Sequence, residues 1–130
     1  MQTSVTDSPT DYVGLAEALG ALADPVRLRL VALLMAFDEP LCVCELSSGL
    51  ALPEYRTSRH LTALRRAGIV SCRRQGLWSY YNLAANACLD PLRGLIRVYP
   101  EDLARMQARL EQRVAGRCTI GPTSEGAQRV

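Results

Sequence analysis

The chain has 130 residues, of which 48% are hydrophobic and 22% charged, a composition typical of one globular domain and not of a disordered or fibrous chain. It contains no apolar run of about 18 residues, and its first residues lack the basic and apolar regions of a signal peptide. We therefore expect a cytoplasmic protein with no membrane partner. The five cysteines are an odd number, which in a reducing compartment favours thiols or metal ligands over a disulfide framework.

Positive charge is concentrated in one part of the chain. The net charge is only +2, and all 15 basic residues are arginines. No acidic residue occurs between Glu54 and Asp90, whereas this stretch contains Arg56, Arg59, Arg65, Arg66, Arg73 and Arg74. The stretch predicts a basic surface that binds a polyanion.

Two helices are predicted at the start of the domain, after a flexible tail over residues 1–10. From Asp11, apolar residues recur at intervals of three and four, which is typical of an amphipathic helix. Asp24-Pro25 is a typical N-cap and first position for a second helix, which Asp38-Glu39-Pro40 ends.

Two further helices form a predicted helix-turn-helix. The first is short and covers residues 42–50. The second is basic, begins at Pro53, runs to about Ala67 and is stopped by Gly68. A short turn joins the two helices, and a basic second helix is the usual DNA-recognition helix of this motif.

Residues 69–83 change to the alternating pattern of strands, with a predicted hairpin tip at Arg73-Arg74-Gln75-Gly76. A basic hairpin directly after a recognition helix is a wing. Asp90-Pro91 then predicts another helix start, with a stripe at Leu92, Leu95, Ile96 and Tyr99, and helical spacing resumes after Pro100. Residues 116–130 have no apolar pattern and predict disorder.

The predicted fold is mainly α with a β-hairpin wing, a winged helix-turn-helix of order ααααββαα in one domain over residues 11–115. The first and last helices are amphipathic but lie outside the helix-turn-helix. Pairing them across a two-fold axis would bury their apolar stripes and place two recognition helices on one face of double-stranded DNA. We therefore expect a homodimer.

Several segments together resemble the ArsR/SmtB family of winged-helix repressors, over roughly residues 12–115. They are Asp24-Pro25-Val26-Arg27-Leu28, Leu41-Cys42-Val43-Cys44-Glu45-Leu46, Ser58-Arg59-His60-Leu61, Leu64-Arg65-Arg66-Ala67-Gly68-Ile69-Val70, Arg73-Arg74-Gln75-Gly76 and Tyr80-Tyr81-Asn82-Leu83. The second resembles the arsenic-sensing motif of the family. The resemblance implies a homodimeric repressor of its own operon that leaves DNA when an inducer binds, here arsenite or antimonite.

Cys42 and Cys44 match this motif and are the predicted metal ligands. A helix N-terminus favours the thiolate form of cysteine, and thiolates select soft ions. The most similar sensors carry a third thiol three residues later, where this chain has Ser47. Cys118 is the preferred third ligand because a flexible ligand need not be preplaced; Cys72, Cys88, an external thiol and a site of only two thiols remain open.

A coupling mechanism is predicted from helix geometry. Residues two apart on a regular helix point about 200° apart, so Cys42 and Cys44 could meet on one ion only if the helix start unwound or tilted. Because this helix leads into the recognition helix, the distortion would lower DNA affinity.

The predicted DNA contacts lie on the recognition helix and the wing, where Arg, Ser and Thr can bond to bases or phosphates. The alternative is a solvated helix face and a plain polar turn, and His60 could instead be structural. The residues are Arg56, Thr57, Ser58, Arg59, His60, Thr62, Arg73, Arg74 and Gln75.

Three other functions compete with an arsenite-responsive repressor. A cadmium, lead or zinc sensor, or a thiol redox switch, could use the same scaffold. An enzyme is disfavoured because the sequence has no Cys-x-x-Cys on a βαβ unit, no phosphate loop and no carboxylate pair. A DNA-binding architectural protein without a ligand leaves the two thiols unexplained.

Overall fold

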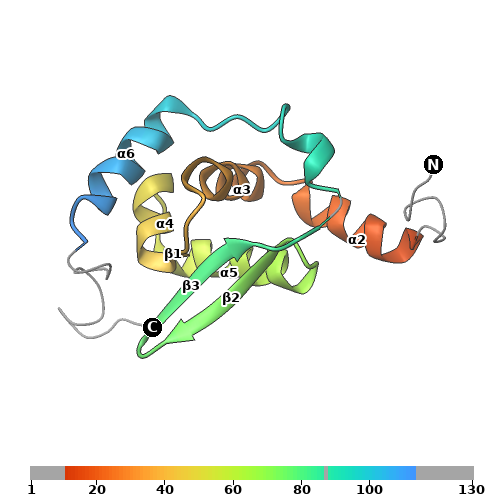
Figure 1. Cartoon of the computed structure of the whole chain (residues 1–130), viewed down its shortest axis with the longest axis horizontal. Helices are drawn as coiled ribbons and strands as arrows, with labels where there is room; N and C mark the ends of the chain where they lie inside the picture. Colours follow the sequence, from red (N-terminus) through yellow and green to blue (C-terminus); the bar gives the residue numbers. More distant parts are fainter. Residues whose placement is uncertain (1–10, 87, 114–130) are drawn as a thin grey trace.

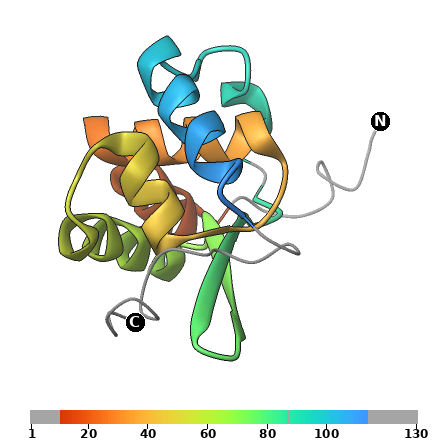
Figure 2. The ribbon, with the colours of Figure 1, turned by 90° about the vertical axis from the view of Figure 1, so that its left-hand side faces the viewer.

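A computed structural model describes residues 11–86 and 88–113, and the predicted tails over residues 1–10 and 116–130 lie outside this part. Helices surround a small sheet whose hairpin projects from the body (Figures 1 and 2). The elements are α2 (Tyr12–Leu22), α3 (Pro25–Phe37), β1 (Leu41–Cys42), α4 (Val43–Leu50), α5 (Glu54–Arg66), β2 (Val70–Gln75), β3 (Trp78–Leu83), the 3₁₀ turn η1 (Asp90–Leu92) and α6 (Pro100–Leu110).

The helix boundaries follow from local capping chemistry. The carboxylate of Asp11 accepts the Gly14 N–H at the start of α2, and that of Asp24 accepts the N–H groups of Val26 and Arg27 at the start of α3. Helix α5 ends before Gly68, whose φ of +79° is a conformation that glycine adopts without strain. The predicted boundaries of the second and fourth helices are therefore confirmed.

The three strands form an antiparallel sheet in the order β1-β3-β2. Tyr80 in the central strand β3 is flanked by Cys42 of β1 on one side and by Arg73 of β2 on the other. The hairpin turns at Gly76 and Leu77, beyond the strand end, so the arginines lie on β2 and not at the tip. The sheet therefore joins the thiol segment directly to the wing.

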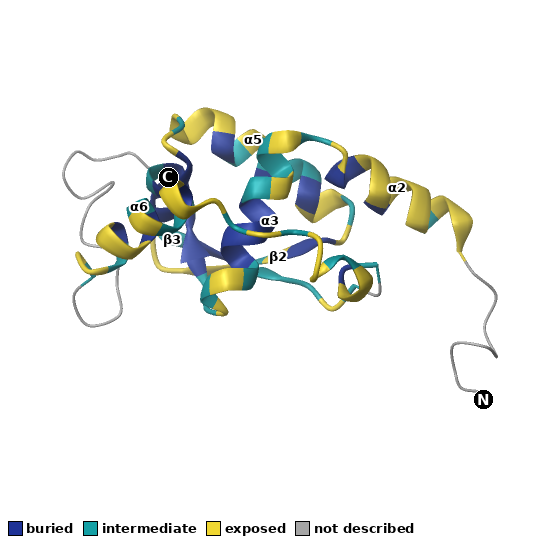
Figure 3. Ribbon diagram, turned by 90° about the horizontal axis from the view of Figure 1, so that it is seen from above, coloured by how far each residue is buried: buried dark blue, intermediate teal, exposed yellow. Residues whose placement is uncertain are grey.

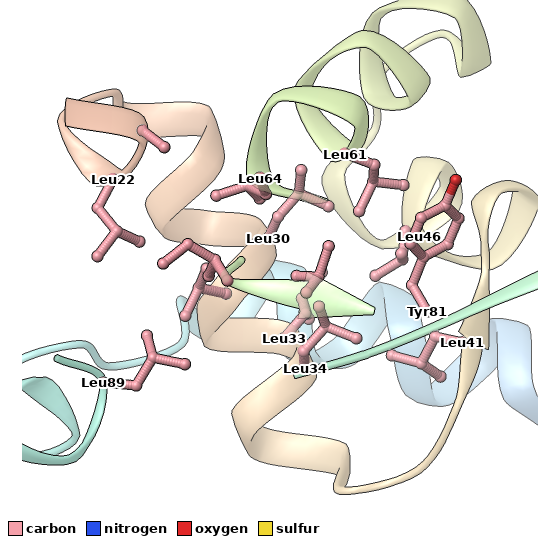
Figure 4. Close-up of a cluster of buried hydrophobic side chains, with 14 of the residues drawn as sticks. Leu22, Leu30, Leu33, Leu34, Leu41, Leu46, Leu61, Leu64, Tyr81 and Leu89 are labelled. Atoms are coloured by element: carbon pink, nitrogen blue, oxygen red, sulfur yellow. The ribbon is translucent and has the colours of Figure 1, made fainter. Parts of the chain in front are cut away.

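The core lies between the helices and the inner face of the sheet (Figure 4). Leucines from the four elements α3, β1, α4 and α5 are fully buried in it. Gly49 of α4 lets α6 approach closely, because a Cβ at this position would lie 3.0 Å from Met106 Cε and 3.1 Å from Leu33 Cδ1. Helix α6 consequently packs along the thiol-bearing helix α4 (Figure 1).

The predicted helix over residues 90–99 is wrong. Only the 3₁₀ turn η1 forms there, and the chain from Ile96 to Tyr99 has no helical structure. Gly94 disfavours helix, and Tyr99 precedes a proline, which disfavours its α conformation. Leu95 and Tyr99 of the predicted apolar stripe are exposed.

Candidate thiol site and DNA-binding surface

Cys42 and Cys44 form a close buried pair at the junction of β1 and α4. Cys42 is the N-cap of α4 and has an extended backbone, with φ −87° and ψ 166°, whereas Cys44 lies in the first turn. Their Sγ atoms are 2.9 Å apart. The prediction that the two sulfurs point apart is wrong, because it placed Cys42 inside a regular helix. The pair needs no unwinding to face one ion.

Aromatic residues of β3 form the surroundings of this pair. Tyr80 is buried against Cys42 and Cys44, and the partly buried Trp78 packs on the same cluster. These side chains place the wing strand β3 in contact with the thiols. The thiol pair therefore packs directly on β3.

Glu45 and Arg113 form hydrogen bonds that fix the backbone at Cys42, at the start of α4. The Glu45 side chain is fully buried, and its Oε1 accepts the Cys42 N–H at 3.1 Å, as in a capping box. Arg113 donates to both carboxylate oxygens of Glu45, at 2.5 and 2.6 Å. These hydrogen bonds raise the pKa of the Arg113 guanidinium above its ordinary value. Charge at this buried site is thus compensated.

A third ligand does not join the pair within residues 11–86 and 88–113, where no group of three His, Cys, Asp or Glu side chains could hold a metal ion. Cys72 packs against the core opposite Tyr81. Burial raises the pKa of the Cys88 thiol and so disfavours its thiolate. The Ser47 hydroxyl is buried and has no hydrogen-bond partner in this part of the chain. Cys118 lies outside the described residues.

The basic surface consists of one face of α5 and the hairpin. Arg56, Arg59, Arg73, Arg74 and Gln75 are exposed, and Ser58 and Thr62 are partly buried. Arg65 and Arg66 extend the same positive surface at the end of α5. Leu61 and Leu64, on the opposite face of α5, are fully buried in the core.

Thr57 is not part of this surface, which corrects its prediction as a DNA contact. The residue is 0% exposed, and its hydroxyl donates to the Pro53 carbonyl one turn earlier. Helical periodicity explains the error, because Thr57 is four residues before Leu61 and shares its inward face. The Thr62 hydroxyl likewise donates to a backbone carbonyl, that of Ser58.

His60 has a structural contact, one of the two roles predicted for it. Its Nδ1 accepts the Arg27 Nε–H at 3.2 Å, which connects the recognition helix to the start of α3. Burial lowers the pKa of His60 below 6.5; Asp24 opposes this effect, and the cations Arg27, Arg56 and Arg59 reinforce it. The folded protein therefore holds His60 neutral at pH 7.

Acidification is expected to destabilise the fold through His60. Because its folded pKa is lowered, the unfolded chain takes up the proton first as pH falls below about 6.5, and stability decreases down to the folded pKa. Well above pH 6.5, where the residue is neutral in both states, it contributes no pH dependence. Urea unfolding of wild type and His60→Gln between pH 7.5 and 5.5 tests this. If the free energy of unfolding changed with pH by the same amount in both proteins, the role of His60 would be contradicted.

Three residues at the candidate surfaces were not predicted from the sequence: Tyr55, Glu45 and Arg113. Tyr55 is 65% exposed in the first turn of α5, the part of a recognition helix that contacts base edges. A capping-box pattern, with an N-cap residue and Glu three residues later, was a signal for Glu45. The sequence contains no local signal for the contact with Arg113, which is 68 residues away.

The comparisons with known proteins agree with this arrangement. Residues 24–71 match the family described as "Bacterial regulatory protein, arsR family". The arsenic resistance transcriptional regulator ArsR1 of Pseudomonas putida is 52% identical over 62 residues, 48% of each chain. An uncharacterised helix-turn-helix transcriptional regulator of Methanocaldococcus jannaschii is 40% identical over 54% of this chain and 78% of its own.

A solved structure shows the same fold. Reduced HlyU from Vibrio cholerae superposes with a TM-score of 0.56 and 33% identity, over 65% of this chain and 90% of the other. The match to the Pseudomonas regulator covers only about half of that protein.

The fold and the basic surface define a winged helix-turn-helix transcriptional regulator. The chain belongs to the arsR family of bacterial regulatory proteins. In the part of the chain that the structure describes, no helix is both long and apolar enough to span a bilayer.

Proposed function

We propose that the protein is a repressor that binds operator DNA as a homodimer and releases it when arsenite or antimonite binds Cys42 and Cys44. The observation that carries this proposal is the 2.9 Å separation of two buried sulfurs at a helix start. Thiolates are the ligands that soft ions prefer. The name of the Pseudomonas relative, an arsenic resistance regulator, supports the same inducer.

Cys118 is the proposed third thiolate. It is five residues after Arg113, whose side chain contacts the thiol segment. Five residues span at most about 18 Å, which allows a loop from Arg113 back to the pair. If the third ligand is an external thiol, or if the site has only two thiols, Cys118→Ser should bind arsenite with the same affinity as wild type.

We propose that ion binding is coupled to DNA binding through the sheet as well as through α4. An ion that changes the position of the sulfurs would displace Tyr80, which packs against both of them. Tyr80 is the strand neighbour of Arg73, a proposed DNA contact of the wing. A coupling of ~1–3 kcal/mol would lower DNA affinity about 5- to 150-fold.

The proposed DNA contacts are the exposed Arg56, Arg59, Arg73, Arg74 and Gln75, with Ser58 at the edge of the surface. Arginine can contact guanine edges through two hydrogen bonds, and the wing arginines suit phosphate or minor-groove contact. We propose His60 and Thr62 only as peripheral DNA contacts, because each side chain already has a hydrogen-bond partner within the protein.

The proposed dimer uses α2, most of which is exposed (Figure 3), through its apolar face. Tyr12, Leu15 and Leu19 share this face, and their exposed fractions are 77%, 37% and 48%. We expect a dimer at micromolar concentration and a monomer for Leu15→Glu, Leu19→Glu, measured by sedimentation. Leu77→Glu on the hairpin, at a leucine 69% exposed, is the matched control and should remain dimeric. A monomeric wild type would refute the dimer.

Binding to labelled promoter DNA tests the function. The reduced protein is mixed with its own upstream promoter, and fluorescence anisotropy is followed at fixed salt, since affinity depends steeply on salt. We expect tight binding that arsenite and antimonite reverse and that zinc does not. Release by cadmium, lead or zinc would support the alternative sensor, and release by oxidant that reductant resets would support a redox switch. Failure to bind DNA would refute the repressor.

A further inference from the structure

We propose that Arg113 is a positioning residue of the thiol site: its guanidinium fixes the segment that holds Cys42 and Cys44 so that both sulfurs face one soft ion. This inference rests on the proposed function, because it concerns the same ligand site. It assigns a role to a side chain that lies just beyond α6 and acts through Glu45, Glu39 and Pro40.

The guanidinium binds both flanks of the thiol segment. On the far side of Cys44 it donates to both oxygens of Glu45, from Nε at 2.5 Å and from a terminal nitrogen at 2.6 Å. On the near side of Cys42 it donates to Glu39 Oε1 at 2.6 Å and to the Pro40 carbonyl at 2.9 Å. One planar group therefore spans residues 39–45.

Glu45 transmits this constraint to Cys42. Its Oε1 accepts from Arg113 and from the Cys42 N–H, so a single buried oxygen joins the guanidinium to the backbone of the first thiol. The Cys42 N–H is an N-cap donor that would otherwise be left unsatisfied by the helix. With Cys42 held in its extended conformation, its sulfur meets that of Cys44.

Only a guanidinium suits all four contacts. Its planar fork donates in two directions at fixed angles, and its charge compensates the fully buried carboxylate. A lysine would supply its charge from a single ammonium group. A glutamine would have no charge and could not donate toward Glu45 and Glu39 at the same time. The arrangement resembles the outer-shell partners that orient metal ligands, whose loss typically lowers metal affinity about 10- to 100-fold.

Arg105 is a matched control within the same helix interface. It lies eight residues earlier and donates to the Gly49 carbonyl at 3.0 Å and to Asp102 at 2.6 Å. It therefore connects α6 to the C-terminal end of α4, away from the thiols. A change that acts only through the packing of α6 on α4 should affect both arginine variants alike.

The test measures the affinity of the full reduced chain for phenylarsine oxide, a probe that needs two close thiols and no third ligand. We expect Arg113→Gln to bind it about 10- to 100-fold more weakly and Arg113→Lys to be intermediate. Arg105→Gln should bind within about twofold of wild type. Glu39→Gln, which removes the negative charge from one partly exposed contact of Arg113, should weaken probe binding less than Arg113→Gln does. It provides an independent test if Arg113→Gln does not fold.

Urea unfolding of each variant separates positioning from stability. The inference is supported if probe affinity falls for the Arg113 or Glu39 variants beyond any change shared with Arg105→Gln. It is overturned if Arg113→Gln or, failing its expression, Glu39→Gln binds like wild type, or if affinity merely follows unfolding free energy across all variants. A wild type that does not bind the probe would instead refute the proposed function.

Discussion

The Cys42→Ser, Cys44→Ser protein is expected to bind operator DNA like wild type and to lose its release by arsenite. Serine is close in size to cysteine and is a favourable N-cap, so the start of α4 should survive the change at Cys42. A hydroxyl is a poor ligand for a soft ion. The whole 5- to 150-fold change in DNA affinity that a coupling of ~1–3 kcal/mol represents should therefore disappear.

Anisotropy titrations of operator DNA with and without arsenite measure this effect. Cys72→Ser and Cys88→Ser are the controls, because both thiols lie outside the pair and its aromatic surroundings. Each control should still release DNA. Normal release by the double variant would show that arsenite acts elsewhere on the protein.

Ser47→Cys is expected to increase arsenite affinity about tenfold, or ~1.4 kcal/mol. Ser47 follows Cys44 by three residues and lies on the same side of α4, where it would supply a preplaced thiol. The substitution breaks no hydrogen bond in the described residues, because the buried Ser47 hydroxyl has no partner there. A preplaced ligand avoids the ordering of a distant one, which is the reason for the gain in affinity.

Combining Ser47→Cys with Cys118→Ser separates the two sources of the third ligand. Cys118→Ser alone should weaken arsenite binding, and adding Ser47→Cys should restore it. Isothermal titration of the four proteins gives the comparison. If Ser47→Cys binds arsenite no better than wild type, the position of Ser47 does not face the ion and the three-thiol geometry is wrong.

Most of the fold was predictable because its signals are local. Asp24 and Pro25 fix the start of α3 through bonds within three residues, and Gly68 ends α5 through its own backbone. The change to alternating strand residues located the hairpin. The helix predicted after Asp90 failed because an apolar stripe was given more weight than Gly94 and Pro100, which oppose helix locally.

The candidate site was predictable in its residues but not in its geometry. The motif identified Cys42 and Cys44, but their contact depends on the extended N-cap conformation of Cys42, which tertiary pairing with β3 stabilises. Thr57 shows the converse error, because a polar residue in a basic helix turned inward and bonded to its own backbone. The contact of Arg113 with Glu45 joins segments far apart in sequence, and no periodicity reveals such a pair.

X-ray absorption at the arsenic edge of the arsenite complex tests the central claim most directly, because it counts the sulfur atoms bonded to arsenic. The proposed site predicts three sulfur neighbours in wild type, two in Cys118→Ser, and loss of the sulfur shell in Cys42→Ser, Cys44→Ser. An arsenic atom surrounded by oxygen alone in wild type, or a sulfur shell unchanged in the double variant, would contradict a thiol sensor at the start of α4.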